Sequence, residues 1–171
     1  PDLIIGSDAS NVCSGNFYDS GSSSAGYSSN ENAVTTICPT LGLSTKVTFS
    51  SFTTSSLLTG EDVLYIYDGN SIASPLLSSG APATSSGFPA GGFYGNGAIP
   101  SGTSYTSSDA SGCLTFKFLS DGGGSNGAGW AATISCESLC LPLPTSPLNN
   151  GVKCFGDNSP LSWPLNPAAS G

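Results

Sequence analysis

The side chains in this sequence that are best equipped for chemistry are its carboxylates. Eleven aspartates and glutamates stand against three lysines and arginines, there is no histidine, and the formal net charge is −8. Such a surplus of negative charge repels phosphate groups, so binding to nucleic acid or to an anionic membrane is not expected. Insertion into a membrane is not expected either, because no apolar run approaches the roughly eighteen residues of a transmembrane span. A cation is the small partner that this charge balance favours.

Catalysis is not expected from these residues. Without histidine, a serine or cysteine nucleophile lacks the base that normally activates it. A glycosidase needs only two carboxylates, and Glu61 and Asp62 are adjacent. Neighbours on a strand point to opposite faces, however, so this pair does not converge on one bond. The sequence therefore indicates a protein that is not an enzyme.

The six cysteines indicate an oxidising compartment. No Cys-x-x-Cys pair occurs and histidine is absent, which argues for disulfides and against a structural zinc site. Disulfides persist outside the reducing cytosol, so we expect an extracellular protein, either secreted or on the cell surface. Six cysteines allow many connectivities, and their spacing alone does not select one.

Four stretches predict the strands that position these groups, at residues 46–49, 63–67, 114–118 and 130–136. The first, third and fourth alternate apolar and polar side chains, as strands buried on one face do. The run 63–67 is apolar on both faces, which indicates a central strand covered on two sides. Residues 78–112 and 122–129 are rich in Gly, Ser and Pro, so we expect loops and short edge strands there. The sequence therefore predicts an all-β, Greek-key-like sandwich.

The sequence changes character after Cys136. Residues 137–171 contain six prolines, which remove backbone donors and favour extended geometry. This part also carries its own cysteine pair, Cys140 and Cys154. We therefore expect a β-sandwich over residues 1–136 and a Pro-rich, disulfide-stapled arm over 137–171. A plain linker to a further domain is the alternative for this arm.

Residues 10–136 contain an ordered set of motifs: Phe17-Tyr18-Asp19-Ser20-Gly21, Ile37-Cys38-Pro39, Val47-Thr48-Phe49-Ser50-Ser51-Phe52, Asp62-Val63-Leu64-Tyr65-Ile66-Tyr67-Asp68-Gly69, Leu114-Thr115-Phe116-Lys117-Phe118 and Gly129-Trp130. This set resembles the CUB domain, the module of complement proteases, developmental metalloproteases and spermadhesins. The residues at these motifs are especially similar to CUB-like modules of secreted bacterial proteins of the Bacteroidetes type. The resemblance implies a jelly-roll β-sandwich.

The resemblance also implies a first disulfide, between Cys13 and Cys38. Proximity then suggests Cys113 with Cys136 and Cys140 with Cys154. Cys113 differs in strand parity from Phe116, whereas Cys136 shares the parity of Trp130, so the second pair requires a strand end or a bulge.

Many CUB domains hold Ca²⁺ at one end of the sandwich, through a Tyr, a Glu and two Asp residues. On that resemblance Asp62 and Asp121 match the two aspartates, and Tyr27 matches the tyrosine. The glutamate position falls on Ser55, so Glu61 or Glu31 would supply the missing charge, and the glycine-rich run 122–126 would add carbonyl oxygens. The alternative is that Asp62 and Asp121 cap turns or accept hydrogen bonds from backbone amides.

Two functional hypotheses follow. The first is a binding or adhesion module that recognises a protein or glycan at the cell surface. The second is a structural subunit of an extracellular filament or coat. Only 8% of residues are charged, so the surface is largely neutral; it is either an ordinary Ser/Thr-rich surface, or it packs against other subunits or carries O-linked sugars. Exposed aromatic residues could stack on sugars or dock a protein, or they could cover the edge of the core: Phe93, Tyr94, Tyr105 and Trp163.

Overall fold

The computed structural model describes residues 1–57, 60–123, 126–138, 140–142 and 152–154. All regular structure in these residues is β, and no described segment forms a helix that could cross a membrane. The strands are β1 (Asp2–Ile4), β2 (Ser14–Tyr18), β3 (Asn32–Ile37), β4 (Leu43–Thr53), β5 (Ser56–Leu57), β6 (Gly60–Glu61), β7 (Val63–Asp68), β8 (Ser104–Thr106), β9 (Leu114–Leu119), β10 (Gly129–Ser138), β11 (Cys140–Pro142) and β12 (Val152–Cys154).

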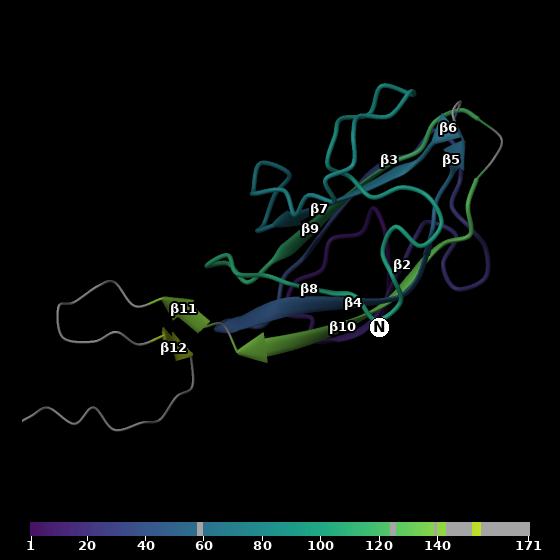
Figure 1. Cartoon of the computed structure of the whole chain (residues 1–171). Coiled ribbons are helices and arrows are strands. Elements are labelled where there is room, and N and C mark those ends of the chain that lie inside the picture. Colours follow the sequence, from purple (N-terminus) through teal and green to yellow (C-terminus); the bar gives the residue numbers. More distant parts are fainter. Residues whose placement is uncertain (58–59, 124–125, 139, 143–151, 155–171) are drawn as a thin grey trace, which may run out of the picture.

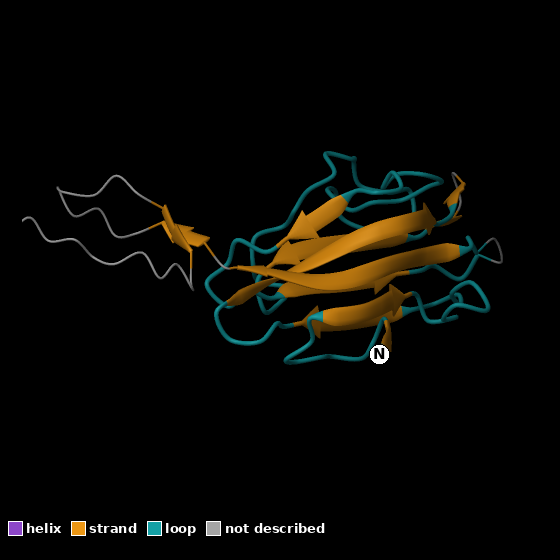
Figure 2. Ribbon diagram, turned by 90° about the horizontal axis from the view of Figure 1, so that it is seen from below, coloured by secondary structure: helices purple, strands orange, loops and turns teal. Residues whose placement is uncertain are grey.

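Two sheets form the body of the molecule (Figures 1 and 2). One has the strand order β1-β2-β10-β4-β8, and the other has the order β3-β9-β7. Their apolar faces enclose one core, in which Phe17 of the first sheet lies 4.8 Å from Phe116 of the second, between ring centroids. The predicted all-β sandwich is therefore confirmed.

The alternating strands bury the faces that the sequence indicated. Phe116 and Phe118 are fully buried between the sheets, and Phe118 meets Trp130 at 5.1 Å between ring centroids. Strand β4 contributes both Phe49 and Phe52 to the core, although they differ in parity. A shift in the β4–β10 register beside Ala131 supplies the extra residue that turns both rings inward.

The run 63–67 is covered on both faces, as predicted, but β9 and not β7 is the middle strand of its sheet. The free edge of β7 pairs with a loop, through bridges from Leu64 to Phe93 and from Tyr67 to Leu76. The same loop covers the outer face of β7, where the Tyr65 hydroxyl donates to the Pro89 carbonyl at 2.6 Å. An irregular segment thus replaces the neighbouring strand that the sequence suggested.

The disulfides correct the first two predicted pairings. Cys13 bonds to Cys136, and Cys38 bonds to Cys113. The reason is the strand register: β2 neighbours β10 with Ser14 opposite Ser135, and β3 neighbours β9 with Ile37 opposite Leu114. One residue beyond each of these pairs, two cysteines face each other. The predicted pairs would each have joined strands of different sheets.

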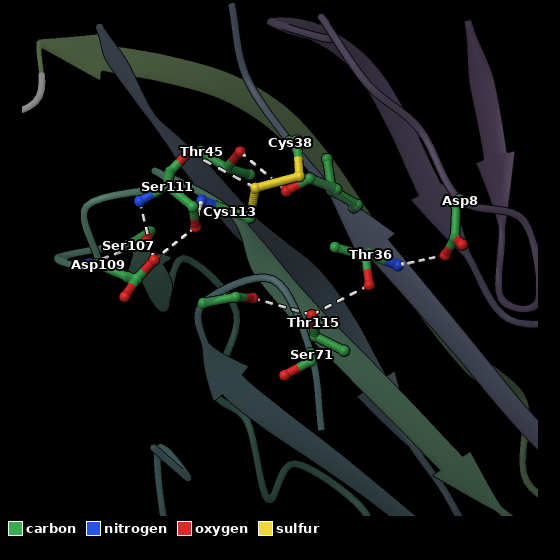
Figure 3. The surroundings of a disulfide bond; sticks show 12 residues. Asp8, Thr36, Cys38, Thr45, Ser71, Ser107, Asp109, Ser111, Cys113 and Thr115 are labelled. Atoms are coloured by element: carbon green, nitrogen blue, oxygen red, sulfur yellow. Dashed lines mark hydrogen bonds between the residues drawn. A yellow bond between two sulfur atoms is a disulfide. The ribbon is translucent and has the colours of Figure 1, made fainter. Parts of the chain in front are cut away.

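Figure 3 shows the surroundings of the Cys38–Cys113 bridge. Ser111 accepts a hydrogen bond from the Cys113 amide at 3.2 Å, and Thr45 donates to the Ile37 carbonyl at 3.2 Å. The same end holds Asp68, whose carboxylate accepts hydrogen bonds from Ser107, Ser108 and Asp109. We call this the cross-linked end, defined by the two disulfides and Asp68.

Strand β10 continues two residues past Cys136 and leads into the predicted arm. In the arm, β11 lies beside β12 (Figure 1), and their pairing places Cys140 opposite Cys154. The side chains of these cysteines lie outside the described part, so their disulfide stays a prediction. Trp163 and most other residues of the arm also lie outside it.

Candidate functional site

The acidic residues singled out in the sequence meet at the end of the sandwich opposite the cross-linked end. Strand β3 begins there, β4 ends there, and the loops before β7 and after β9 join them (Figure 1). We call this end the tip, defined by Tyr27, Glu31, Ser55, Asp62 and Asp121. Hydrogen bonds and shared charge effects connect these five residues.

The hydroxyl of Tyr27 joins three loops. It accepts hydrogen bonds from the amides of Ser55 at 2.9 Å and Gly127 at 2.7 Å, and it donates to Asp62 Oδ2 at 2.7 Å. Burial raises the pKa of Tyr27, so the hydroxyl keeps its proton as the donor to Asp62. Both lone pairs and the proton are occupied, so this oxygen has no capacity left for a metal ion in the present arrangement.

Asp62 is a carboxylate that is 1% exposed. Its Oδ1 accepts a hydrogen bond from the Asp121 amide at 2.9 Å. Burial raises its pKa, and the nearby carboxylates of Asp121 and Glu31 raise it further. A cation at the tip would relieve this unfavourable charge.

Ser86 donates hydrogen bonds to both Asp121 and Glu61. Asp121 Oδ2 accepts from the Ser86 hydroxyl at 3.0 Å, while Glu61 Oε2 accepts from Ser85 at 2.7 Å and from the Ser86 amide at 3.3 Å. The hydrogen bond from Ser85 lowers the pKa of Glu61. Glu61 is therefore directed to the 85–86 turn, and its described hydrogen bonds do not reach Asp62.

Two tip residues carry buried polar atoms without a hydrogen-bond partner. Glu31 Oε1 accepts from the Ser28 amide at 2.7 Å and from the Ser20 hydroxyl, but Glu31 Oε2 is buried and unpaired. The hydroxyl of Ser55 is buried and unpaired as well. Ser55 occupies the position where the resemblance to CUB domains predicts a glutamate. An unsatisfied buried oxygen costs free energy unless water or an ion meets it.

Within the described residues, no three carboxylates, thiols or imidazoles converge closely enough to form a ready metal site. The alternative of backbone hydrogen bonding is observed, since Asp62 accepts from the Asp121 amide and Asp121 accepts from the Gly123 amide at 2.6 Å. Two residues of the 122–126 run, 124 and 125, lie outside the described part. Asp62, Asp121 and Glu31 supply hard oxygens of the kind that Ca²⁺ prefers, but the described structure does not bring them together as a set of ligands.

Sequence reasoning missed Asp19 as part of this region. Its side chain is fully buried and accepts hydrogen bonds from the Gly21 amide at 2.8 Å and the Trp130 amide at 3.0 Å. Burial raises its pKa, and Glu31 adds to the effect. The run Asp19-Ser20-Gly21 is typical of an Asx turn, which is the signal that would have marked it.

The exposed aromatic residues proposed from the sequence are largely part of the core. Phe93 is buried, and Tyr105 packs against it at 5.6 Å between ring centroids. Tyr105 also meets Phe49 edge-on at 6.0 Å. These two rings therefore cover the edge of the core, which was the alternative explanation, while Tyr94 is half-buried.

Comparison with known proteins places the fold beside CUB-containing structures. No family model and no curated protein matches the chain. Among solved structures, it is similar to the CUB1-EGF-CUB2 domains of rat MASP-1, with 14% identity, a TM-score of 0.53 and coverage of 80% of this chain and 43% of that one. The CUB1-EGF-CUB2 domain of human MASP-1/3 gives 17% identity and a TM-score of 0.54, with coverage of 74% and 42%.

The full extracellular region of zebrafish Gpr126/Adgrg6 is a third similar structure, with 14% identity, a TM-score of 0.52 and coverage of 83% and 15%. The chain thus spans less than half the length of each structure that it matches, and none of the three is bacterial. At these identities the likeness concerns the fold alone. The predicted CUB-like sandwich is therefore confirmed as the fold of this chain.

Proposed function

We propose that this chain is a non-catalytic extracellular binding module that recognises a protein or glycan at the cell surface through its tip, with Ca²⁺ as a structural ligand. Two disulfides and a fold similar to part of the extracellular region of Gpr126/Adgrg6 support the extracellular setting. The absence of histidine from the sequence supports a role other than acyl transfer.

The observation that carries this proposal is the buried carboxylate of Asp62 at the tip, with the half-buried carboxylates of Asp121 and Glu31 near it. Asp62 is ionisable and nearly inaccessible to solvent. Its described hydrogen-bond partners include no positively charged side chain. Glu31 Oε2 and Ser55 Oγ are buried without partners beside it. Such an arrangement lowers stability, and proteins keep it where function needs it.

Calcium fits this cluster by chemistry. The ion prefers oxygen ligands supplied by loops, and Asp62, Asp121 and Glu31 would have to move closer together to hold it, with loop carbonyls completing the shell. The ion would supply positive charge that offsets the desolvation of Asp62 and fixes the tip loops relative to one another. Tyr27 would act as a positioning residue, because its hydroxyl is already committed to Ser55, Gly127 and Asp62.

Calorimetric titration of the purified chain with CaCl₂ tests the metal part of this proposal. The wild type should bind one ion, Glu31→Gln and Asp121→Asn should bind it more weakly, and Asp8→Asn at the other end should bind as the wild type does. A wild type that takes up no calcium, and whose thermal unfolding is the same in calcium and in chelator, would overturn the metal part. Adhesion of the labelled chain to intact cells, with the two tip variants as controls, tests recognition separately.

Self-assembly into a filament or coat is a second candidate, which one observation favours. Leu41 is 93% exposed in the turn between β3 and β4, at the end from which β10 leads into the arm. Single exposed apolar side chains are common on monomers, but Leu41 is the most exposed large hydrophobic side chain of the described residues, so it is the position at which a subunit contact is tested. Light scattering of the wild type and Leu41→Ser tests it: concentration-dependent particles that Leu41→Ser abolishes would support assembly, and a monomer at all concentrations would contradict it.

A further inference from the structure

A hollow on the outer face of the five-stranded sheet is unused by the tip residues. It has a volume of about 550 Å³, within the range of small-molecule sites. Its floor is a row across three adjacent strands, since Tyr18 of β2 and Ser51 of β4 both lie opposite Ala131 of β10. The small side chain of Ala131 between them makes the depression.

The wall of this hollow is a serine-rich loop held in a fixed shape. Residues 22–26 line it, together with Ala128. The Asp19 carboxylate fastens the base of the loop to the sheet through the amides of Gly21 and Trp130. A Cβ on Gly26 would lie 2.5 Å from the Gly127 carbonyl oxygen, so only glycine permits the loop to pack this closely. The site is therefore formed before any ligand arrives, which limits the entropy that binding must overcome.

The lining is neutral and rich in hydroxyls. It presents Ser23, Ser24 and Ser51 in exposed positions and the half-buried ring of Tyr18 at one side. Its one ionisable carboxylate, Asp19, is fully buried and occupied by amides. A charged ligand would find no counter-ion here, whereas hydroxyls beside an aromatic face suit a ligand that has hydroxyls and an apolar C–H face.

We propose that this hollow, formed by Tyr18, Ser51, Ala131 and the 22–26 loop, binds a neutral carbohydrate. A peptide is disfavoured because the floor strands β2, β10 and β4 use their backbone groups in the ladders of the sheet, and an extended peptide binds by pairing with an open edge. This site rests on the glycan recognition in the proposed function and locates it in the hollow. It does not require the tip or its cation.

Two-dimensional amide NMR of the full chain in chelator tests this inference with cellobiose, lactose, mannobiose and chitobiose as probes. At least one should shift the amides of Tyr18, Ser51, Ala131 and residues 22–26. Ala131→Leu should fill the floor and weaken that binding by about tenfold or more. Thr133→Leu is the matched control, because Thr133 is exposed on the same strand face but lies outside the hollow.

The inference is overturned if none of the four sugars shifts these amides, or if Ala131→Leu and Thr133→Leu bind alike. Should Ala131→Leu fail to fold, Ser24→Ala replaces it, since loss of one exposed hydroxyl leaves the packing intact and should still weaken binding. Shifts produced instead by a neutral Gly-Ser peptide would contradict the carbohydrate assignment. Sugar binding is measured without calcium, so a lack of sugar binding would not contradict the proposed role of the tip. A lack of calcium binding at the tip would likewise not contradict the carbohydrate site in the hollow.

Discussion

The two ends of the sandwich bury carboxylates in surroundings that shift their pKa values in opposite directions. At the cross-linked end, Asp68 accepts hydrogen bonds from Ser107, Ser108 and Asp109. Burial alone would raise its pKa, but these bonds outweigh burial and lower it. Asp62 at the tip and Asp19 beside it are more deeply buried, and burial raises both pKa values. No disulfide joins the described residues of the tip.

This difference indicates that the cross-linked end stabilises the fold, and it supports the proposal that the tip binds a ligand. The cross-linked end satisfies its carboxylate and is braced by two covalent bonds, so it contributes stability. The tip leaves Glu31 Oε2 and Ser55 Oγ unpaired and places Asp62 near other negative charges. Polar groups buried at a cost mark the part of a protein where a ligand is expected to act.

Removing a disulfide should produce the largest effect. The Cys38–Cys113 bridge closes a loop of sequence separation 75, and the double variant Cys38→Ser with Cys113→Ser should lower the free energy of unfolding by on the order of 4 kcal/mol. Urea unfolding measures the loss. A double variant as stable as the wild type would show that the bracing of this end is not what stabilises the fold.

Asp62→Asn should cost about 1 to 2 kcal/mol although the shapes match, because removal of the buried charge offsets part of the loss of hydrogen bonding. Asp62 accepts from two donors, the Tyr27 hydroxyl and the Asp121 amide, and the amide group of Asn would face one of them with a donor of its own. Asp8→Asn is the control, because its carboxylate accepts a bond from the Thr36 amide that Asn can also accept. Equal unfolding free energies for the two variants would contradict the role assigned to Asp62.

The two ends should respond to pH with opposite signs and a smaller effect. Raised pKa values at Asp19 and Asp62 mean that their contribution to stability is fully present below 3.8 and is lost as the pH rises through the folded pKa. The lowered pKa of Asp68 means that its contribution is present above 3.8 and is lost as the pH falls through the folded pKa.

Hydrogen exchange in chelator resolves this difference. The Trp130 amide, bound to Asp19, should gain protection as the pH falls from neutral toward 3.8, after correction for intrinsic exchange. The Ser108 amide, bound to Asp68, should lose protection only below 3.8. Parallel changes at both amides would remove the distinction between the ends.

Lys46→Ala should have the smallest effect, within about 0.5 kcal/mol. Lys46 forms an ion pair with Glu137 on the surface of β4 and β10, where solvent screens the charges. Urea unfolding of this variant beside the disulfide variant shows whether covalent bracing or surface charge stabilises this side of the molecule. A loss comparable to that of the disulfide variant would contradict the account.

The sequence predicted the features that depend on local alternation. Phe116, Phe118 and Trp130 were assigned to the core because apolar residues recur at every second position, and they are buried. Strand β2 was missed because Gly15 and Asn16 interrupt its pattern. The pairing of Cys13 with Cys136 depends on which strands become neighbours, and contacts between residues so far apart in the chain leave no local signal.

The candidate site was predictable only in part, because some of its contacts join residues that are far apart in the chain. Resemblance brought Tyr27, Asp62 and Asp121 together, and they are connected in the structure. The contacts of Glu61 with Ser85 and Ser86 depend on the path of a long loop, which composition does not determine. The burial of Asp19 likewise follows from the return of Trp130 beside it, which is a long-range contact.

Residue-resolved hydrogen exchange with and without calcium tests the central claim most directly. If the tip is a cation-dependent binding end, calcium should increase protection of the Ser28, Asp121 and Gly127 amides, which bond to Glu31, Asp62 and Tyr27, and should leave the Ser108 and Asp109 amides beside Asp68 unchanged. Protection that stays the same at the tip, or that rises equally at both ends, would contradict the account.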